Sequence, residues 1–294
     1  MKAYIFPGQG SQFPGMGIYL YKYYPLARQL FNLANKILGF NITKYQLEKK
    51  YANYLNFTRI TQPTIYIYSV IAAKILKLVP DMIAGHSLGE LTALTISGVL
   101  DFETCLNLVY KRALAMETEC KNIKSNMAAI FGLEDNLIEN TCKEVSGIVV
   151  PANYNCTGQL VISGETTAIN KTCELLILKG AKKIILLPVE GGFHSPIMEP
   201  ARDKLANYIS NINFNNPICP IYQNINAVPT KNNLQIKENI INQLINPVKW
   251  KQSIENMILN GANIFIEIGP KNILQSLIKK INKYVYTIHY KNVF

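Results

Sequence analysis

Short apolar runs alternate with amphipathic stretches along most of the chain. Residues 2–6 (KAYIF) predict a strand that runs into a glycine-rich turn, and helical periodicity covers much of 20–38 and 61–79. Apolar residues then lead into a tight turn near residue 87, and helices are expected over about 88–98 and 102–118. This order indicates an α/β protein with a parallel sheet covered by helices.

The pattern changes between residues 126 and 194. Strands are predicted at 127–133, 147–155, 160–164 and 182–189, with helices at 135–145 and 166–180. The order βαββαβ is typical of a ferredoxin-like unit. We therefore expect a ferredoxin-like subdomain at 126–194, inserted into a larger domain of residues 1–125 and 195–294. After the insert, a helix is predicted at 196–211, and a strand, turn and helix at 262–281.

Composition is that of a globular protein, since 49% of the 294 residues are hydrophobic and 17% are charged. The longest apolar candidate for a membrane span, residues 65–79, is broken by Lys74 and Lys77. The N-terminal segment reaches Pro7-Gly8 too early for the apolar region of a signal peptide. We expect a cytoplasmic protein without a membrane anchor.

The net charge of +11 raises the question of a nucleic-acid partner. The lysines are spread along the chain, and the aromatic residues follow no RNA-binding signature, so no nucleic-acid partner is expected. A basic surface also suits the phosphates of coenzyme A or an acidic carrier protein. The six cysteines are scattered without a C-x-x-C pair, and only three histidines could join them, so no metal site is expected.

Residues 85–89 (GHSLG) match the G-x-S-x-G pattern, with Ser87 at the centre. The predicted strand, sharp turn and helix around it are the context of a nucleophile elbow. Lipases, thioesterases and acyltransferases all carry such an elbow. The motif therefore leaves open whether an acyl group on Ser87 passes to water or to a second carrier.

A serine hydroxyl needs a neighbouring base to become a good nucleophile, and histidine is the usual base near neutral pH. His86 adjoins Ser87 on a tight turn, where consecutive side chains point apart, and His289 lies in an alternating tail typical of a structural strand residue. His194 lies in a glycine-led loop before a proline-initiated helix and is the expected base. No aspartate is obviously placed to orient it, and Glu190 need not reach it. We expect a Ser-His dyad whose histidine is oriented by a backbone or amide oxygen.

Several further motifs occur with the elbow, in a fixed order over nearly the whole chain: FPGQGSQ (6–12), GHSLGE (85–90), VYKRALAME (109–117), ANYNCTGQLVISG (152–164), FHS (193–195), QLINPVKW (243–250) and EIGPKNIL (267–274). In this the chain resembles the malonyl-CoA:acyl carrier protein transacylases and the acyltransferases of polyketide synthases. The resemblance implies an α/β-hydrolase-like parallel-sheet domain with a ferredoxin-like insert.

The resemblance also implies ping-pong chemistry. Ser87, deprotonated by His194, would take a malonyl group from malonyl-CoA and pass it to the phosphopantetheine thiol of an acyl carrier protein, for fatty-acid or polyketide synthesis. The backbone N–H groups of Gln9 and Leu88 would form the oxyanion hole, and a main-chain carbonyl near Gln243 would orient the histidine. No cofactor of the enzyme itself is implied, and we expect a monomer.

Arg112 would bind the free carboxylate of the malonyl group, because a guanidinium fork in a dry pocket suits a carboxylate. Phe193 would crowd a substituent at the α-carbon and so disfavour methylmalonyl. Glu117, which stands where the family often has glutamine, is expected to pair with Arg112 and weaken its hold on substrate. The alternative function is an acyl hydrolase of the same fold that clears acyl groups from carrier proteins. Retention of Arg112 favours transfer.

Overall fold

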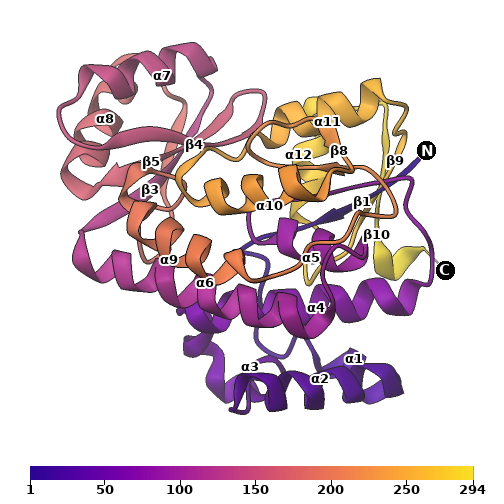
Figure 1. The fold of residues 1–294 in the computed structure, drawn as a ribbon. Coiled ribbons are helices and arrows are strands. Elements are labelled where there is room, and N and C mark those ends of the chain that lie inside the picture. The colour runs from indigo at the N-terminus through magenta and orange to yellow at the C-terminus, as the bar shows by residue number, and fades with distance from the viewer. Residues whose placement is uncertain (294) are drawn as a thin grey trace.

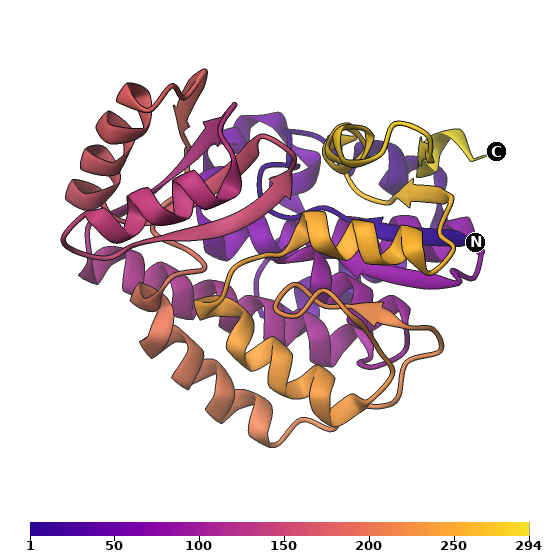
Figure 2. The same cartoon turned by 90° about the horizontal axis from the view of Figure 1, so that it is seen from above.

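A computed structural model describes residues 1–293 of the chain; Phe294, the last residue of the predicted large domain, lies outside the described residues. The fold is α/β, with one mainly parallel sheet, one antiparallel sheet and helices packed around both (Figure 1). Figure 2 shows the two sheets side by side, with the antiparallel one at the end of the molecule away from both termini.

The larger sheet has six strands in the order β10-β9-β1-β2-β7-β8. The first five in this order are parallel, and β8 pairs with β7 in the antiparallel direction. The strands are β1 (Lys2–Phe6), β2 (Met82–Gly85), β7 (Ile221–Tyr222), β8 (Pro229–Thr230), β9 (Ile264–Glu267) and β10 (Tyr286–His289).

Both faces of this sheet are buried, as the apolar sequence of β1 requires. Tyr4 and Phe6 point into one hydrophobic cluster, whereas Ala3 and Ile5 point into the cluster on the opposite face. Side chains alternate along a strand, so a strand that is apolar at every position needs cover on both sides. The sheet is therefore the middle layer of the larger part.

Twelve α-helices lie within residues 1–293: α1 (Ile18–Tyr23), α2 (Pro25–Leu38), α3 (Lys44–Leu47), α4 (Thr58–Leu76), α5 (Gly89–Ile96), α6 (Phe102–Asn122), α7 (Asp135–Glu144), α8 (Thr166–Leu178), α9 (Glu199–Ser210), α10 (Asn233–Asn242), α11 (Trp250–Leu259) and α12 (Ile273–Ile281). Short 3₁₀ helices occupy Lys49–Asn56, Pro196–Met198, Gln243–Ile245 and Tyr290–Asn292. None of these helices combines the length and the apolar character that a membrane crossing requires.

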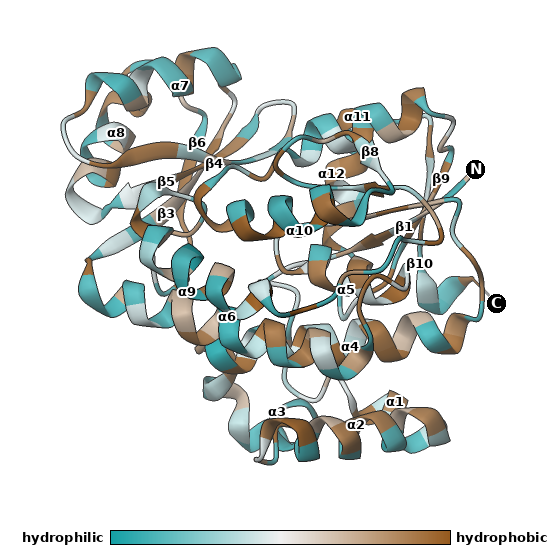
Figure 3. Cartoon of the chain, viewed as in Figure 1, coloured by the Kyte–Doolittle hydropathy of each residue, from teal (hydrophilic) through white to brown (hydrophobic). Residues whose placement is uncertain are grey.

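The helix α4 packs against α5 and α6, and α2 covers it from outside. Of its 19 residues 16 are buried, as expected for a helix enclosed on several sides, and its ribbon in Figure 3 mixes brown with white and teal segments. The helices α11 and α12 cover the opposite face of the sheet, where Trp250 and Ile278 join the second hydrophobic cluster.

The helix predicted over 20–38 is two helices in the structure. Tyr24 adopts extended backbone angles (φ −122°, ψ 114°) and separates α1 from α2. Pro25 explains the break, because its ring disfavours a helical conformation at the residue before it, while it fits the first position of a new helix.

The smaller sheet is antiparallel, with strands in the order β4-β5-β3-β6. Its strands are β3 (Ser125–Phe131), β4 (Val149–Cys156), β5 (Gln159–Glu165) and β6 (Lys183–Leu186), with α7 between β3 and β4 and α8 between β5 and β6. The four strands and two helices thus lie where the sequence pattern predicts them. Ile130 and Ile162 pack against Ile138 of α7 and Ile169 of α8 on one face of the sheet.

Candidate active site

Ser87 lies in the sharp turn between β2 and α5, with a positive φ of 51°. Glycines make this turn tight: a Cβ atom on Gly85 would lie 2.0 Å from the carbonyl carbon of Gly89, and one on Gly89 would lie 2.0 Å from the carbonyl oxygen of Phe6. The small residues allow α5 to start directly against the ends of β1 and β2. The strained serine is thereby presented at the carboxyl end of the sheet.

His194 contacts the serine directly. Its Nε2 lies 2.7 Å from Oγ of Ser87, although the two residues are far apart in sequence. Its Nδ1 lies 3.0 Å from the carbonyl oxygen of Gln243 and 3.2 Å from that of Asn246. Carbonyl oxygens only accept hydrogen bonds, so the ring hydrogen belongs on Nδ1. Nε2 is then free to accept the serine proton.

The histidine is 3% exposed and also has a positive φ, of 57°. Its segment follows β6 and is fixed to the smaller sheet, because the backbone N–H of Gly192 donates to Oγ of Ser125 at 2.8 Å. Burial, and next the charge of Arg112, lower the pKa of His194 to about 3. The imidazole is therefore neutral near pH 7, as a base must be.

Arg112 projects from α6 into the same place and is 1% exposed. Its guanidinium donates to Oε1 of Gln62 at 2.8 Å, to Oε1 of Gln243 at 2.9 Å and to Oγ of Ser87 at 3.2 Å. Burial lowers the pKa of Arg112 to about 10, so it remains positively charged near neutral pH. Within residues 1–293, no carboxylate forms an ion pair with it.

The expected pairing between Glu117 and Arg112 is wrong. Glu117 forms ion pairs with Arg59 of α4 and, at 3.2 Å, with Lys121. Five residues along a helix correspond to about 500° of rotation, so the two side chains leave α6 in different directions. Glu117 therefore does not occupy the guanidinium of Arg112, which can still bind an anion.

The turn after β1 brings Gln9 beside Ser87, and both line one cavity with Leu88. A Cβ atom on Gly8 would lie 2.6 Å from the carbonyl oxygen of His86, so only glycine lets the turn come so close. Neither the Gln9 nor the Leu88 backbone N–H donates to another group of residues 1–293. Both donors are therefore available to an oxygen atom in the cavity.

Part of the cavity wall is apolar and is formed by Met116, Met127, Leu187, Val189 and Phe193. Phe193 is 5% exposed and is therefore part of the wall itself. An adjoining groove shares Gln9 with this cavity and extends between the smaller sheet and α12. The groove therefore adjoins the cavity that Ser87 lines.

The other histidines and the acidic candidate have different partners. His86 bonds to Asn155 at 2.9 Å, and His289 bonds to the carbonyl oxygen of Gly269 at 3.0 Å. Glu190 accepts from the backbone N–H of Thr58 at 2.6 Å, at the start of α4. The orienting partners of His194 are thus carbonyl oxygens, without a carboxylate.

Three buried polar residues of the site are absent from the sequence analysis as individual candidates: Gln62, Glu90 and Asn224. The Asn224 side chain accepts from the backbone N–H of Ser87 at 2.7 Å and donates to the carbonyl oxygen of Gly85 at 2.6 Å, so it holds the turn in shape. Glu90 could have been found from the sequence, because it ends the motif GHSLGE at 85–90. Gln62 and Asn224 belong to no motif that would have identified them.

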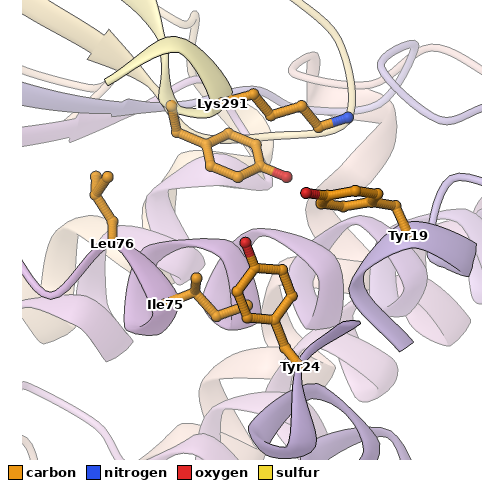
Figure 4. A pocket seen from close by; sticks show the side chains of 6 residues that line it. Tyr19, Tyr24, Ile75, Leu76 and Lys291 are labelled. Atoms are coloured by element: carbon orange, nitrogen blue, oxygen red, sulfur yellow. The ribbon is translucent and has the colours of Figure 1, made fainter. Parts of the chain in front are cut away.

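A separate cavity of about 240 Å³ lies between α1, the end of α4 and the C-terminal 3₁₀ helix (Figure 4). Tyr19 and Tyr24 turn their hydroxyl groups toward it, and Tyr290 also lines it. None of its lining residues takes part in the contacts around Ser87. It is a different cavity from the candidate active site.

Comparison with known proteins decides the family. The model of the acyl transferase domain family matches residues 3–290. The chain belongs to this acyltransferase family. It is 37% identical to the malonyl CoA-acyl carrier protein transacylase of Bacillus subtilis (strain 168), over 97% of this chain and 92% of that protein.

Solved structures of the acyltransferase family agree with the fold. An acyl carrier protein S-malonyltransferase from Vibrio cholerae superposes with a TM-score of 0.94 at 34% identity, over 98% of this chain and 96% of that one. A malonyl-transacylase in complex with the acyl-carrier protein of a type II PKS gives a TM-score of 0.93 at 34% identity, over 98% of this chain and 94% of that chain.

Proposed function

We propose that the protein transfers a malonyl group from malonyl-CoA to the phosphopantetheine thiol of an acyl carrier protein. The observation that carries this proposal is the meeting of three groups: the Ser87 hydroxyl, the neutral imidazole of His194 at 2.7 Å and the buried guanidinium of Arg112 at 3.2 Å. The names of the relatives, and the complex of one of them with its carrier protein, support the same assignment.

In the first half-reaction Nε2 of His194 takes the proton of the Ser87 hydroxyl while Oγ attacks the thioester carbonyl carbon. The carbonyl oxygen becomes an oxyanion and receives the N–H groups of Gln9 and Leu88, which have no other acceptor within residues 1–293. The carbon–sulfur bond then breaks, and the sulfur of coenzyme A takes the proton back from His194. The product is a malonyl ester of Ser87.

In the second half-reaction the thiol of the carrier protein gives its proton to His194 and attacks the ester carbonyl. The carbon–oxygen bond breaks, and Oγ of Ser87 recovers the proton. Each half-reaction begins and ends with a neutral imidazole, so one dyad serves both. The carbonyl oxygens of Gln243 and Asn246 keep Nδ1 protonated throughout and orient the ring.

Arg112 selects a carboxylated acyl group in this proposal. A buried guanidinium without an ion-pair partner is costly, and a malonyl carboxylate would satisfy it with charge-assisted hydrogen bonds. Phe193 forms the wall on which a methyl substituent at the α-carbon would press. Both residues act on the acyl group, so they determine selectivity while Ser87 and His194 determine the reaction.

We further propose that residues 126–194 are a ferredoxin-like subdomain inserted into an α/β-hydrolase-like domain of residues 1–125 and 195–294. The strand order β4-β5-β3-β6 with helices on one face supports this. A cytoplasmic monomer that needs no cofactor of its own stays our prediction.

The test is to incubate the protein with malonyl-CoA labelled in the malonyl group, with and without a phosphopantetheinylated carrier protein. A transferase forms a stable label on Ser87 that moves to the carrier when it is added. Rapid loss of label as free malonate without the carrier would instead support the hydrolase, and no label on the protein would refute both. The apo form of the same carrier, which lacks the thiol, is the matched control.

A further inference from the structure

The side chain of Gln243 stands between two buried charges. Its Oε1 accepts from Nη2 of Arg112 at 2.9 Å, and its Nε2 donates to Oε2 of Glu90 at 3.0 Å. The same Nε2 lies 3.0 Å from the carbonyl oxygen of Ser87. A guanidinium and a carboxylate are thus joined through one amide and do not touch each other.

The charges determine which way this amide faces. A guanidinium can only donate hydrogen bonds and a carboxylate can only accept them, so the amide must turn its oxygen to Arg112 and its nitrogen to Glu90. Three partners therefore hold the orientation of Gln243: Arg112, the carboxylate of Glu90 and the carbonyl oxygen of Ser87, which also accepts from Nε2. Without Glu90, Nε2 loses its charged acceptor, and the amide and the guanidinium bound to it are held less firmly.

Glu90 is fully buried at the start of α5, and both oxygens of its carboxylate accept hydrogen bonds. Oε1 accepts from Nε2 of Gln223 at 2.8 Å, and Oε2 accepts from the backbone N–H of Asn224 at 2.9 Å in addition to Gln243. Burial raises the pKa of the Glu90 carboxyl. These hydrogen bonds, the charge of Arg112 and the N-terminus of α5 oppose that rise and favour the ionised form.

The distance between the charges matters because a direct ion pair would occupy the guanidinium. A second pair shows the contrast: Glu117, on the same helix as Arg112, contacts Arg59 of α4 directly. Arg112 instead has a negative charge close enough to offset its burial, while the donors that face Ser87 stay free of any carboxylate. An anionic acyl group can then bind without displacing a resident anion.

We propose that Glu90 determines acyl specificity as a positioning residue: through Gln243 it holds the guanidinium of Arg112 charged, oriented and open for the carboxylate of the acyl donor. This inference rests on the proposed function, because it assigns Arg112 to the acyl carboxylate. It predicts that the position of the negative charge, and not its presence alone, decides the selectivity.

Three variants and a control separate these effects. Glu90→Gln removes the charge and keeps the shape, and Glu90→Asp keeps the charge. The double variant Glu90→Gln, Gln243→Glu moves the carboxylate onto Arg112 at constant net charge and retains the backbone carbonyl that faces His194. Glu119→Gln is the control. Glu119, on α6, is a buried glutamate like Glu90, but it pairs with Lys204 at 2.9 Å and does not contact Gln243 or Arg112. Thermal unfolding selects the variants that fold, and KM and kcat for labelling of Ser87 are measured with malonyl-CoA and acetyl-CoA.

We expect Glu90→Gln to raise KM for malonyl-CoA by about tenfold, the size of one charge-assisted contact, with little change for acetyl-CoA. Glu90→Asp should keep most of the malonyl preference, Glu119→Gln all of it, and the double variant should lose more than Glu90→Gln alone. The inference is overturned if Glu90→Gln slows both donors equally, or if the double variant restores the wild-type malonyl KM. Wild-type protein that takes no label would refute the proposed function itself, whatever the variants do.

Discussion

Arg112 and Ser87 are in contact: Nη2 of the guanidinium lies 3.2 Å from Oγ of the nucleophile. Groups that bind the two ends of one acyl unit must lie as far apart as those ends. A malonyl group has a single methylene between its carboxylate and its thioester carbonyl, so a contact this close suits malonyl better than a longer diacid.

Arg112→Ala is therefore expected to reduce the preference for malonyl-CoA over acetyl-CoA by about tenfold to a hundredfold, the value of a charge-assisted hydrogen bond in a buried site. The measurement is the rate of Ser87 labelling with each donor. The conservative Arg112→Lys should recover only part of the preference, since an ammonium cannot reproduce the planar fork. An unchanged ratio in Arg112→Ala would remove Arg112 from the acyl site.

His194→Ala should slow labelling of Ser87 by about a thousandfold, because the hydroxyl loses its proton acceptor. His289→Ala is the matched control, since His289 contacts the carbonyl oxygen of Gly269 and not the serine. Ser87→Ala should take no label at all. Equal losses in the two histidine variants would indicate damage to the fold, and a labelled Ser87→Ala would place the acyl group elsewhere.

The pH dependence follows from the charge beside the imidazole. With the pKa of His194 at about 3, labelling should not decline on the acid side through this group until about pH 4. Removing the positive charge in Arg112→Met favours the protonated imidazole, so the pKa of His194 rises and the acid decline moves to higher pH. Rates with acetyl-CoA between pH 3.5 and about 8 test this, because acetyl-CoA has no carboxylate of its own. A decline that stays in place or moves to lower pH contradicts the coupling.

Phe193→Ala should widen the cavity beside the acyl group, because the ring is part of its apolar wall. We expect labelling from methylmalonyl-CoA to rise by at least about tenfold relative to labelling from malonyl-CoA, the discrimination that one methyl group can carry. Competition between the two donors in one reaction measures the ratio directly. If the ratio does not change, the ring has only a packing role.

Gly89→Ala should destabilise the protein and abolish labelling, because the added Cβ would lie 2.0 Å from the carbonyl oxygen of Phe6. Overpacking of this kind typically costs about 1–3 kcal/mol, and backbone atoms cannot move aside as a side chain can. Gly180→Ala is the control: Gly180 also borders a helix and has no atom within 4 Å of the added Cβ, so only the strain of its positive φ remains. Thermal unfolding should rank the two variants in this order.

The sequence predicts the elements that leave a long periodic pattern and misses those that do not. The continuous apolar run in residues 3–6 and the βαββαβ order at 126–194 are visible because each covers several successive residues of one pattern. The strands β7 and β8 have two residues each, too few to show alternation, and they depend on pairing with β2 and each other. Pro25 is a local sign of a helix break, but the prediction over 20–38 followed the helical periodicity and did not use it.

The candidate site divides in the same way. Ser87 and His194 belong to motifs, and histidine is rare enough in this chain for elimination to work. Gln62 is one amide in the middle of a helix, and only the packing of α4 against α6 brings it to Arg112. No sequence pattern reports that contact, and none reports that Glu117 turns to Arg59. The chemical roles of these residues stay predictions until the labelling experiments are made.

The attachment of His194 has a mechanical consequence. The segment that carries the imidazole is tied to Ser125 of the antiparallel sheet, whereas the hydroxyl it must deprotonate projects from a turn of the parallel sheet. Reacting groups tolerate displacements of only about 0.5 Å. A displacement of one sheet relative to the other would therefore change the 2.7 Å contact between Ser87 and His194 and slow proton transfer.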